Sequence, residues 1–379
     1  MRKDHAAVYH KIQLPFKINK PVLAFGSQAK NTLCFGAGNF AYLSRIHPDL
    51  SRPQDYALFL KDARYFLKKH PRVIAYDLHP GYQSTQYALN LSAIRYTLSA
   101  VQHHHAHIAS CMADNGLENQ KVIGVAFDGT GLGGDHDLWG GEFLICDYKN
   151  YIRKAHLKEI PLLGGERAIM EPWRLAAAWL YLIYGERFLD LKIRFTAGID
   201  KHKWGILKNM YLKNINSPSA SSIGRLFDAV ASIILDKSIV LEEAELAIEL
   251  EKIAARGARD AKVYRYGVKK GKGEYILDPS VMIKEIVADL KVKEAKEKIA
   301  YRFHLALAQM ILKVCLILRK ENKINRVLLS GGVFQNSLLL GLSLDLLYKE
   351  GFQVFRHKNA ACGDSGVSLG QAAVASFRS

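Results

Sequence analysis

Three segments of the chain share one pattern: a short run of apolar, often β-branched residues leads directly into a turn of glycine and other small residues. They are residues 21–35 (PVLAFGSQAKNTLCF), 121–147 (KVIGVAFDGTGLGGDHDLWGGEFLICD) and 325–351 (NRVLLSGGVFQNSLLLGLSLDLLYKEG). Continuous apolar runs are typical of strands that are buried on both faces. Glycine turns at strand ends expose backbone N–H groups, and nucleotide phosphates bind at such junctions. The pattern therefore predicts an α/β fold with a nucleotide cleft.

The spacing within and between these segments predicts how the fold is organised. The second segment predicts a hairpin, with strands at 122–127 and 141–146 joined by a glycine-rich, acidic loop, and the third predicts a strand, a Gly-Gly turn and a helix from about Gln335. Between them the apolar residues repeat with helical spacing. Helices are expected in four stretches: 171–185, 221–235, 241–260 and 292–322. Strand-rich ends around a helical middle predict an α/β core that carries a helical insertion.

Composition predicts a soluble, intracellular chain. Of the 379 residues, 49% are hydrophobic and 23% are charged, which is ordinary for a globular protein with a sizeable core. The five cysteines are scattered without a C-x-x-C pair, which argues against a zinc ribbon and against a disulfide framework. Residues 1–16 lack the apolar core of a signal peptide, and the apolar run at 305–318 contains Gln309 and Lys313, so we expect a buried helix there. We therefore expect a cytoplasmic protein that does not contact a membrane.

The net charge bears on binding partners more than on the fold. Lysine and arginine number 53 against 36 aspartate and glutamate, which gives a formal charge of +17. An excess of this size fits binding of RNA, of an acidic protein or of an anionic small substrate. A solvated, lysine-rich surface without such a partner fits equally well. The charge alone therefore neither predicts nor excludes nucleic acid as a partner.

A run of histidines, VQHHHAHIASC at 101–111, is the strongest sign of chemistry. The stretch from His103 predicts a helix that ends at Gly116, and His103 and His107 are spaced i,i+4, so their side chains lie on one helix face. Two imidazoles in this arrangement can bind one metal ion. His104 and His105 point elsewhere and are interpreted as polar lining. We expect the 103/107 pair to be metal ligands.

Two histidines need further ligands, and aspartates in glycine-rich turns are a natural source. Asp128 follows the predicted strand VIGVAF, and Asp364 lies in ACGDSGVSLGQAA just before a helix of small residues. Taken singly, an aspartate in such a place is more often a cap or a turn residue. A His/His/Asp/Asp set is a mixed nitrogen and oxygen site that suits divalent Fe, Zn or Mn.

Several stretches resemble one known family, in the same order along the chain. They are GSQAKNTLCF, AYDLHPGYQST, QHHHAHIASCMADNGL, GVAFDGTGLGGDHDLWGGEF, GGERAIMEPWRLA, GRLFDAVAS, LSGGVFQNSLLL and GDSGVSLGQAA. Together they are similar to the C-terminal half of the hydrogenase maturation carbamoyltransferases, HypF, over roughly residues 15–379. That region is itself similar to the tRNA threonylcarbamoyladenosine synthases and to antibiotic O-carbamoyltransferases.

The resemblance implies a fold and a division of the chain. The implied fold is α/β, an actin/hexokinase-like (ASKHA) pair of ribonuclease-H-type lobes around a nucleotide cleft, with a helical insertion. We accordingly expect a lead-in over residues 1–20, a first lobe over 21–118 that ends in the histidine-rich helix, and a second lobe over 119–379. The second lobe would hold the insertion, at about 160–322, and the nucleotide-binding turns.

The chain also departs from the family pattern. Full-length members carry an acylphosphatase domain, zinc-finger-like C-x-x-C modules and an adenylate-forming domain ahead of this region, so we expect a stand-alone transfer module that is supplied by a separate adenylate-forming protein. Glu166 stands where the family usually has Asp, and GDSGV replaces the more usual DGG. Ala244 stands where the family has Gly, which puts a methyl group near the expected nucleotide.

Matching the motifs position by position assigns roles to individual residues. The metal is placed at His103 and His107, with Asp128 and Asp364 completing or adjoining its shell. Asp128, together with Glu171 and Arg174 of EPWR, is expected to take part in catalysis. The residues expected to bind the nucleotide are Thr130, Gly131, Gly165, Asp228, Gly331, Gly332 and Asn336.

The function implied by the resemblance is carbamoyl transfer from carbamoyl adenylate, made with ATP and leaving AMP, to the C-terminal cysteine of the partner HypE. The thiocarbamate becomes a cyanide ligand of the nickel–iron hydrogenase. Three alternatives stay open: a tRNA threonylcarbamoyl transferase, a nucleotide-binding scaffold without activity, and transfer to a small-molecule hydroxyl. QHHHAHIAS, DLWGGEF and EPWR favour the hydrogenase-maturation pattern over the tRNA one.

Overall fold

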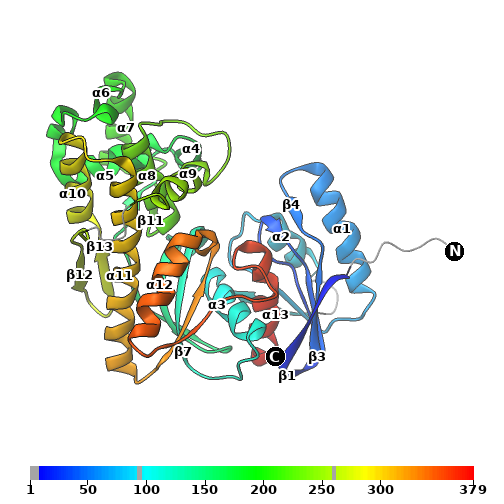
Figure 1. The fold of residues 1–379 in the computed structure, drawn as a ribbon. Coiled ribbons are helices and arrows are strands. Elements are labelled where there is room, and N and C mark those ends of the chain that lie inside the picture. Colours follow the sequence, from blue (N-terminus) through cyan, green and yellow to red (C-terminus); the bar gives the residue numbers. More distant parts are fainter. Residues whose placement is uncertain (1–7, 92–95, 258–261) are drawn as a thin grey trace.

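The computed structural model describes residues 8–91, 96–257 and 262–379. The chain forms two lobes, each built on its own sheet (Figure 1). In the first lobe the strand order is β3-β1-β5-β6, with β3 antiparallel to β1 and the other pairs parallel. Its strands are β1 (Val8–Ala24), β3 (Cys34–Ser44), β5 (Val73–Asp77) and β6 (Thr97–Val101), and its further elements are β2 (Ala29–Asn31), β4 (His47–Asp49), α1 (Pro53–Leu67) and α2 (Gln83–Asn90).

The start of the first lobe differs from the lead-in expected over residues 1–20. Strand β1 begins at Val8 and pairs with β3 from there onward. Ile12 and Leu14 are buried, while Lys11 and Gln13, which alternate with them along the strand, are exposed. This alternation has the two-residue period of a strand that packs one face against the core. Residues 8–20 therefore belong to the sheet.

The second lobe is built on a larger sheet that contains both glycine-turn segments of this part of the chain. The main strand order is β12-β13-β9-β8-β7-β14-β15. Its strands are β7 (Val122–Leu132), β8 (Leu138–Cys146), β9 (Tyr151–Leu157), β12 (Gly267–Lys270), β13 (Tyr275–Asp278), β14 (Arg326–Ser330) and β15 (Gln353–Phe355), with the short strands β10 (Ile160–Pro161) and β11 (Ser219–Ala220) attached through β8. The expected hairpin is present, with Val122 opposite Cys146, and both strands extend beyond the expected limits to Leu132 and Leu138.

Helices follow the expected helical middle of the chain and lie on the second lobe. They are α4 (Arg167–Met170), α5 (Trp173–Tyr184), η1 (Gly185–Asp190), α6 (Arg194–Ala197), α7 (Lys201–Lys213), α8 (Ile223–Leu235), α9 (Glu245–Ala254), α10 (Ser280–Lys291), α11 (Lys296–Asn322), η2 (Gly332–Gln335) and α12 (Ser337–Lys349). Local sequence sets their limits. Ser222 caps α8 by accepting from the Arg225 N–H, and Gly185, with φ of +60°, ends α5.

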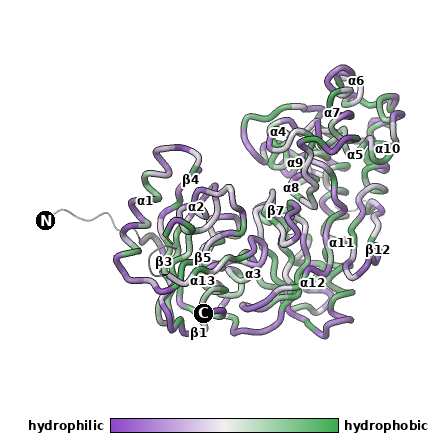
Figure 2. Tube along the Cα trace, turned by 180° about the vertical axis from the view of Figure 1, so that it is seen from behind, coloured by the Kyte–Doolittle hydropathy of each residue, from purple (hydrophilic) through white to green (hydrophobic). Residues whose placement is uncertain are grey.

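Helix α11 carries the long apolar run. Among the described residues it is the one helix long and apolar enough to cross a membrane, and 61% of its most apolar window is buried inside the protein. Its buried residues, which include Phe303 and Val314, belong to the core of the second lobe. Hydrophobic and hydrophilic residues alternate along the chain in both lobes, as expected of elements with one buried side (Figure 2). We interpret α11 as a core helix.

Two helices pack against one another between the lobes and join them. They are α3 (His103–Asp114) and the C-terminal α13 (Val367–Arg378), which is preceded by the short turn η3 (Asp364–Gly366). Helix α13 packs on the sheet of the first lobe, and α3 packs on β7, β8 and β14 of the second. A Cβ on Gly370 would stand 1.8 Å from the Ala106 carbonyl oxygen, so glycine permits this close approach. The helix pair carries the histidine-rich face to the junction of the lobes.

Candidate functional site

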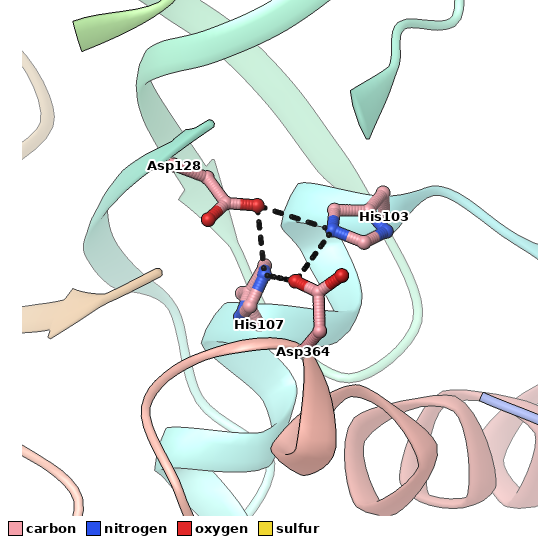
Figure 3. Close-up of side chains that lie close together, drawn as sticks. All are labelled: His103, His107, Asp128 and Asp364. Atoms are coloured by element: carbon pink, nitrogen blue, oxygen red, sulfur yellow. Dashed lines mark hydrogen bonds and ion pairs between the residues drawn. The ribbon is translucent and has the colours of Figure 1, made fainter. Parts of the chain in front are cut away.

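Four side chains that the sequence singles out meet at the junction of the two lobes (Figure 3). His103 and His107 come from the first two turns of α3, Asp128 from the apolar strand β7, and Asp364 from the turn before α13. One ligand atom from each residue can be chosen so that all four atoms lie within 4.8 Å of one another. The first three residues are buried and the fourth is partly buried. The structure thus brings together the residues expected to hold a metal.

The contacts are between imidazole nitrogens and carboxylate oxygens. His103 Nε2 lies 3.3 Å from Asp128 Oδ2 and 3.6 Å from Asp364 Oδ1. His107 Nε2 lies 3.4 Å from the same Asp128 oxygen and 3.6 Å from the same Asp364 oxygen. The other oxygen of Asp128 accepts a hydrogen bond from the Gly332 N–H at 2.9 Å. Two nitrogens and two oxygens therefore face one point.

A fifth residue orients the first imidazole. His103 Nδ1 donates to Asp77 Oδ2 at 2.8 Å, and both side chains are fully buried. Because the carboxylate can only accept, the proton is on Nδ1 and the lone pair of a neutral ring is on Nε2, which faces the cluster. A carboxylate behind a ligating histidine is the usual arrangement in metal sites. Asp77 was not among the residues predicted from the sequence.

The two carboxylates place negative charge beside the imidazoles, and the pKa values of all these groups shift in response. Burial lowers the pKa of the His103 imidazole, but the Asp77 charge and hydrogen bonds to the two cluster carboxylates outweigh burial and hold the pKa well above its ordinary value. Burial likewise lowers the pKa of His107, and the same carboxylates raise it on balance. Burial raises the pKa of Asp128, but hydrogen bonds to the imidazoles outweigh it and hold the pKa well below its ordinary value. Protons balance the buried charge here, and a divalent ion can take their place.

The residues fit a metal ion. Within the described chain, His107 Nδ1 is buried without a hydrogen bond, and His107 Nε2 lies 3.4 Å from Asp128 Oδ2 and 3.6 Å from Asp364 Oδ1. These Nε2 contacts are longer than ordinary hydrogen bonds, and an ion bound between the nitrogen and the carboxylates fits them. Two imidazoles and two carboxylates suit Zn, Fe or Mn. His103, His107, Asp128 and Asp364 are therefore the residues that can hold the ion.

The other two histidines of the run lie outside the cluster. His105 Nε2 donates to the Asp147 carbonyl oxygen at 2.6 Å, and burial lowers the pKa of this ring to about 4. His104 Nδ1 accepts from Gln102 Nε2 at 3.0 Å. Both are neutral residues that fasten α3 to neighbouring segments.

A cavity of about 520 Å³ opens beside the cluster. Asp128 and Asp364 belong both to the cluster and to the cavity wall. The wall is formed by residues of both lobes: Gln28, Ala29, Lys30, Tyr82, Asp128, Gly129, Thr130, Gly224, Arg225, Phe227, Asp228, Glu243, Ala244, Ala247, Ile248, Glu251, Gly332, Val333, Gln335, Asn336, Gly363 and Asp364. The volume suits a mononucleotide-sized ligand.

The residues expected to bind a nucleotide divide into two groups. Thr130, Asp228, Gly332 and Asn336 line the cavity. The other three, Gly131, Gly165 and Gly331, are not among its lining residues.

Gly131 and Gly331 serve close packing beside the site. Gly131 lies in β7 after a bulge, and a Cβ there would stand 2.6 Å from the His103 ring. Gly331 has φ of +103°, and a Cβ there would stand 2.1 Å from the Phe127 carbonyl oxygen. Gly131 therefore makes room for the first imidazole, and Gly331 lets the turn after β14 approach β7.

Asn336 lines the cavity with an amide that is already engaged. Its Oδ1 accepts from the Leu339 N–H at 2.8 Å and caps α12. Its Nδ2 lies 3.0 Å from Nε2 of His304, whose Nδ1 donates to the Ala300 carbonyl oxygen. Since that tautomer leaves Nε2 as the acceptor, Asn336 donates to it. A buried histidine thus fixes the amide on the cavity wall.

Glu171 and Arg174, expected in catalysis, form an ion pair outside this cavity. Arg174 Nε donates to Glu171 Oε2 at 2.8 Å, and Arg174 Nη1 donates to the Leu163 carbonyl oxygen at 3.1 Å. Arg174 lines a separate cavity of about 300 Å³, together with Gly164 and Trp173. Gly165, with φ of +61°, lies in the turn beside it. These residues hold the turn before α4 to the start of α5, and their catalytic role stays a prediction.

Of the charged residues in the cavity wall that sequence reasoning missed, Arg225 is the buried one. The Arg225 guanidinium is 2% exposed; its Nη2 donates to Glu243 Oε1 at 2.8 Å, and its Nε lies 3.3 Å from Asp228 Oδ2. Burial raises the pKa of Asp228 to about 6, and the charge of Arg225 opposes this rise. Arg225 stands three residues before Asp228 in GRLFDAVAS, so helical spacing was the signal that could have found it.

Comparison with known proteins assigns the chain to a family. Residues 124–371 match the family model described as "Carbamoyltransferase, Kae1-like Domain, second subdomain", and residues 17–114 match "HypF Kae1-like domain". The chain belongs to the HypF family. The resemblance found from the sequence motifs is therefore confirmed.

Curated HypF relatives differ in length. The chain is 35% identical over 365 residues to a "Carbamoyltransferase HypF homolog" of Cupriavidus necator, covering 94% of this chain and 91% of the relative. It is 33% identical over 387 residues to the carbamoyltransferase HypF of Synechocystis sp., covering 98% of this chain and 49% of that protein. The chain thus spans nearly all of one relative and about half of the other.

Solved HypF structures confirm the fold. Full-length HypF in a phosphate- and nucleotide-bound form matches with a TM-score of 0.91 and 37% identity over 97% of this chain and 48% of that one. T. kodakarensis HypF matches with a TM-score of 0.87 and 29% identity over 100% of this chain and 50% of that one. The expected α/β fold of the ASKHA type, with its helical insertion, is confirmed.

Proposed function

We propose that this chain transfers a carbamoyl group from carbamoyl adenylate to the C-terminal cysteine thiol of a HypE-like protein, as a step of nickel–iron hydrogenase maturation. The observation that carries the proposal is the His/His/Asp/Asp cluster at one end of a mononucleotide-sized cavity, in a chain of the HypF family. Relatives named as carbamoyltransferases and a nucleotide-bound HypF structure support it. ATP and AMP are expected to enter the same cavity.

In this reaction the enzyme has to orient the carbamoyl adenylate and the acceptor thiolate, and it does not have to supply a nucleophile of its own. The acceptor thiolate attacks the carbamoyl carbon, a C–S bond forms, and the bond from that carbon to the phosphate oxygen breaks, so that the electron pair leaves with AMP. Burial raises the pKa of Cys111 and of Cys362 above their ordinary value, so both thiols stay protonated and unreactive. The attacking sulfur therefore comes from the acceptor.

The chain's own residues hold the donor in place. Gly129 and Thr130, in the bulge of β7, line the cavity, and their backbone N–H groups suit a phosphate. Asp228 suits ribose hydroxyls, because its buried carboxylate lines the cavity and its Oδ2, which is 3.3 Å from Arg225 Nε, makes no hydrogen bond in the described chain. A divalent ion held by the cluster would supply positive charge for a phosphate or carbamoyl oxygen. Preorganised donors of this kind lower the activation barrier by about 3 to 4 kcal/mol when they act as oxyanion-hole donors.

We further propose that the carbamoyl adenylate reaches the cavity from a separate adenylate-forming protein, in the cytoplasm. The support is the relative of nearly equal length that carries the carbamoyltransferase name. An adenylate delivered in this way would meet the cavity wall formed by both lobes, where Lys30 and Gln28 of the first lobe face the second.

Intact-mass spectrometry of the acceptor tests the proposal. The metal-loaded chain is incubated with carbamoyl adenylate and a HypE-like peptide that ends in cysteine, beside the same peptide ending in serine. We expect a carbamoyl adduct on the cysteine peptide alone. His103→Ala and His107→Ala should abolish the adduct, whereas His105→Gln, on the same helix but outside the cluster, should retain it.

Two results would contradict the proposal. One is the absence of an adduct while metal stays bound and the adenylate stays intact. The other is transfer to tRNA in place of the peptide, which the charge of +17 makes worth testing in the same assay. Binding to tRNA that weakens steeply with salt would then assign the chain to the tRNA-modifying branch.

A further inference from the structure

Tyr82 has an unusual position in the cavity wall. It is the last residue of the HPGY turn (79–82) of the first lobe and stands at the N-cap of α2. It lines the cavity next to Asp128 and Asp364, although it belongs to neither the cluster nor the nucleotide turns. Within the described chain its phenolic oxygen makes no hydrogen bond, and as the N-cap residue its side chain accepts none.

The turn that holds Tyr82 is tied to the metal cluster. Asp77, which accepts from His103 through Oδ2, also accepts from the His79 N–H through Oδ1 at 3.0 Å. The His79 ring accepts from the Gly81 N–H at 3.1 Å and stacks on the Tyr82 ring, with centroids 4.2 Å apart and planes 12° apart. One carboxylate therefore fixes both the first imidazole and the turn that directs Tyr82 into the cavity.

The charges around the phenol determine its protonation state. Burial raises the pKa of Tyr82, and the charges of Asp77, Asp128 and Asp364 raise it further, while His103 opposes them. The hydroxyl is therefore a neutral O–H donor at neutral pH. Because Tyr82 lines a cavity whose wall also carries Asp128, Asp364 and Arg225, a neutral hydroxyl donor there is suited to an oxygen of the ligand.

We infer that the Tyr82 hydroxyl is a catalytic hydrogen-bond donor to the carbamoyl oxygen, on which negative charge develops as the acceptor attacks. This inference rests on the proposed function. During attack the carbonyl electron pair moves onto that oxygen; the phenol keeps its proton throughout and only shortens its hydrogen bond. When the bond to the phosphate oxygen breaks, the carbonyl re-forms and AMP departs with the electron pair.

Tyr82→Phe removes the hydroxyl and keeps the ring that stacks on His79. We expect kcat for carbamoyl transfer to fall by about 10²-fold, as for loss of one donor at an oxyanion site. The KM for carbamoyl adenylate, the affinity for AMP and the melting temperature should change little, because the hydroxyl makes no hydrogen bond in the described chain. Hydrolysis of carbamoyl adenylate, with water as the acceptor, should fall by a similar factor.

Tyr87→Phe is the matched control. Tyr87 lies on the same helix, packs edge-on against Phe25 and Phe59, and is not among the residues that line the cavity. Its loss of a hydroxyl should leave kcat unchanged.

Each other result overturns the inference. If Tyr82→Phe transfers as fast as wild type, the hydroxyl has no part in catalysis. If only KM or AMP affinity changes, the hydroxyl binds the ground state and does not stabilise the developing charge. If the wild-type chain neither transfers nor hydrolyses the carbamoyl group, the proposed function fails, and this inference fails with it.

Discussion

The Nδ1–H of His103 donates to Asp77 Oδ2 across 2.8 Å, and neither side chain is exposed to solvent. Asp77 is the last residue of β5 and His103 is the first of α3, which follows the neighbouring parallel strand β6. The two residues lie close because parallel strands end at the same edge of a sheet. The contact fixes the imidazole tautomer that presents a lone pair to the cluster.

Replacing Asp77 by Asn should therefore weaken metal binding without removing a ligand. An amide can donate to Nδ1, which would move the ring proton to Nε2 and block the lone pair. We expect metal affinity to fall by about 10- to 100-fold. Titration of the metal-free variant against a competing chelator measures this.

Asp62→Asn is a matched control for that titration. Asp62 is also a buried carboxylate next to an imidazole, with its Oδ2 3.2 Å from His47 Nε2, but this pair lies in the first lobe outside the cluster and the cavity. The metal affinity of the Asp62→Asn variant should equal that of the wild type. Equal losses in both variants would mean that destabilisation, not the tautomer, explains the result for Asp77.

The four cluster residues could be chosen from the sequence because each carries a local signal. His103 and His107 have i,i+4 spacing, and Asp128 and Asp364 stand in glycine-rich turns after apolar runs. The family motifs then linked segments that are more than 200 residues apart. The ASKHA-type fold followed from the same motifs.

The remaining contacts depend on packing that local patterns do not specify. Asp77 meets the cluster because β5 and β6 pair in parallel, and Tyr82 lines the cavity because the HPGY turn is tied to Asp77 through the His79 N–H. Gly131 was expected to bind the nucleotide, but it follows a bulge in β7, and a Cβ there would meet the His103 ring. Arg174 pairs with Glu171 three residues earlier, and spacing alone does not show that this pair faces a second cavity.

The stability of the metal-free chain should depend on pH through the cluster. The pKa values of His103 and His107 are raised above 6.5, so their contribution to stability is present below pH 6.5 and is lost as pH rises through the folded values. The pKa values of Asp128 and Asp364 are lowered from 3.8, so their contribution is present above pH 3.8 and is lost as pH falls through the folded values. The metal-free chain should be most stable between these limits.

A bound divalent ion should remove the loss at high pH, because it takes the place of the protons. Melting temperatures recorded from pH 5.5 to about 8.5, with a chelator and with added Zn or Mn, measure this difference. The gap between the two curves should widen above pH 6.5. Parallel curves would contradict a metal site at these residues.

Nucleotide affinity should have its own pH dependence, set by Asp228. Because burial raises the pKa of this carboxyl to about 6, it is ionised at pH 7.5 and mostly protonated at pH 5. We expect adenosine, which lacks the phosphate that itself titrates near pH 6, to bind about ten- to a hundredfold more weakly at the lower pH, the effect of losing a hydrogen bond to a charged group. Calorimetric titration at both pH values measures the change.

Asp228→Asn resembles the protonated form and should bind adenosine weakly at both pH values. Asp289→Asn is the control, because Asp289 pairs with Arg302 at 2.8 Å and does not line the cavity. It should retain the wild-type pH dependence. A wild-type affinity that does not change between pH 5 and pH 7.5 would exclude Asp228 from the nucleotide contacts.

Ala244 adopts a left-handed conformation, with φ of +65° and ψ of 5°, where it caps α9 and lines the cavity. A side chain at such a φ costs roughly 1–2 kcal/mol, part of which the greater unfolded-state freedom of glycine offsets. Ala244→Gly should therefore raise the free energy of unfolding by up to about 1 kcal/mol, as measured by urea denaturation.

Ala255→Gly is the control, because Ala255 lies at the other end of α9 with φ of −61°. It removes the same methyl group without relieving strain and should not stabilise the chain. If both variants change stability equally, the backbone at Ala244 is not strained; if Ala244→Gly also binds AMP more tightly than wild type, its methyl group crowds the nucleotide.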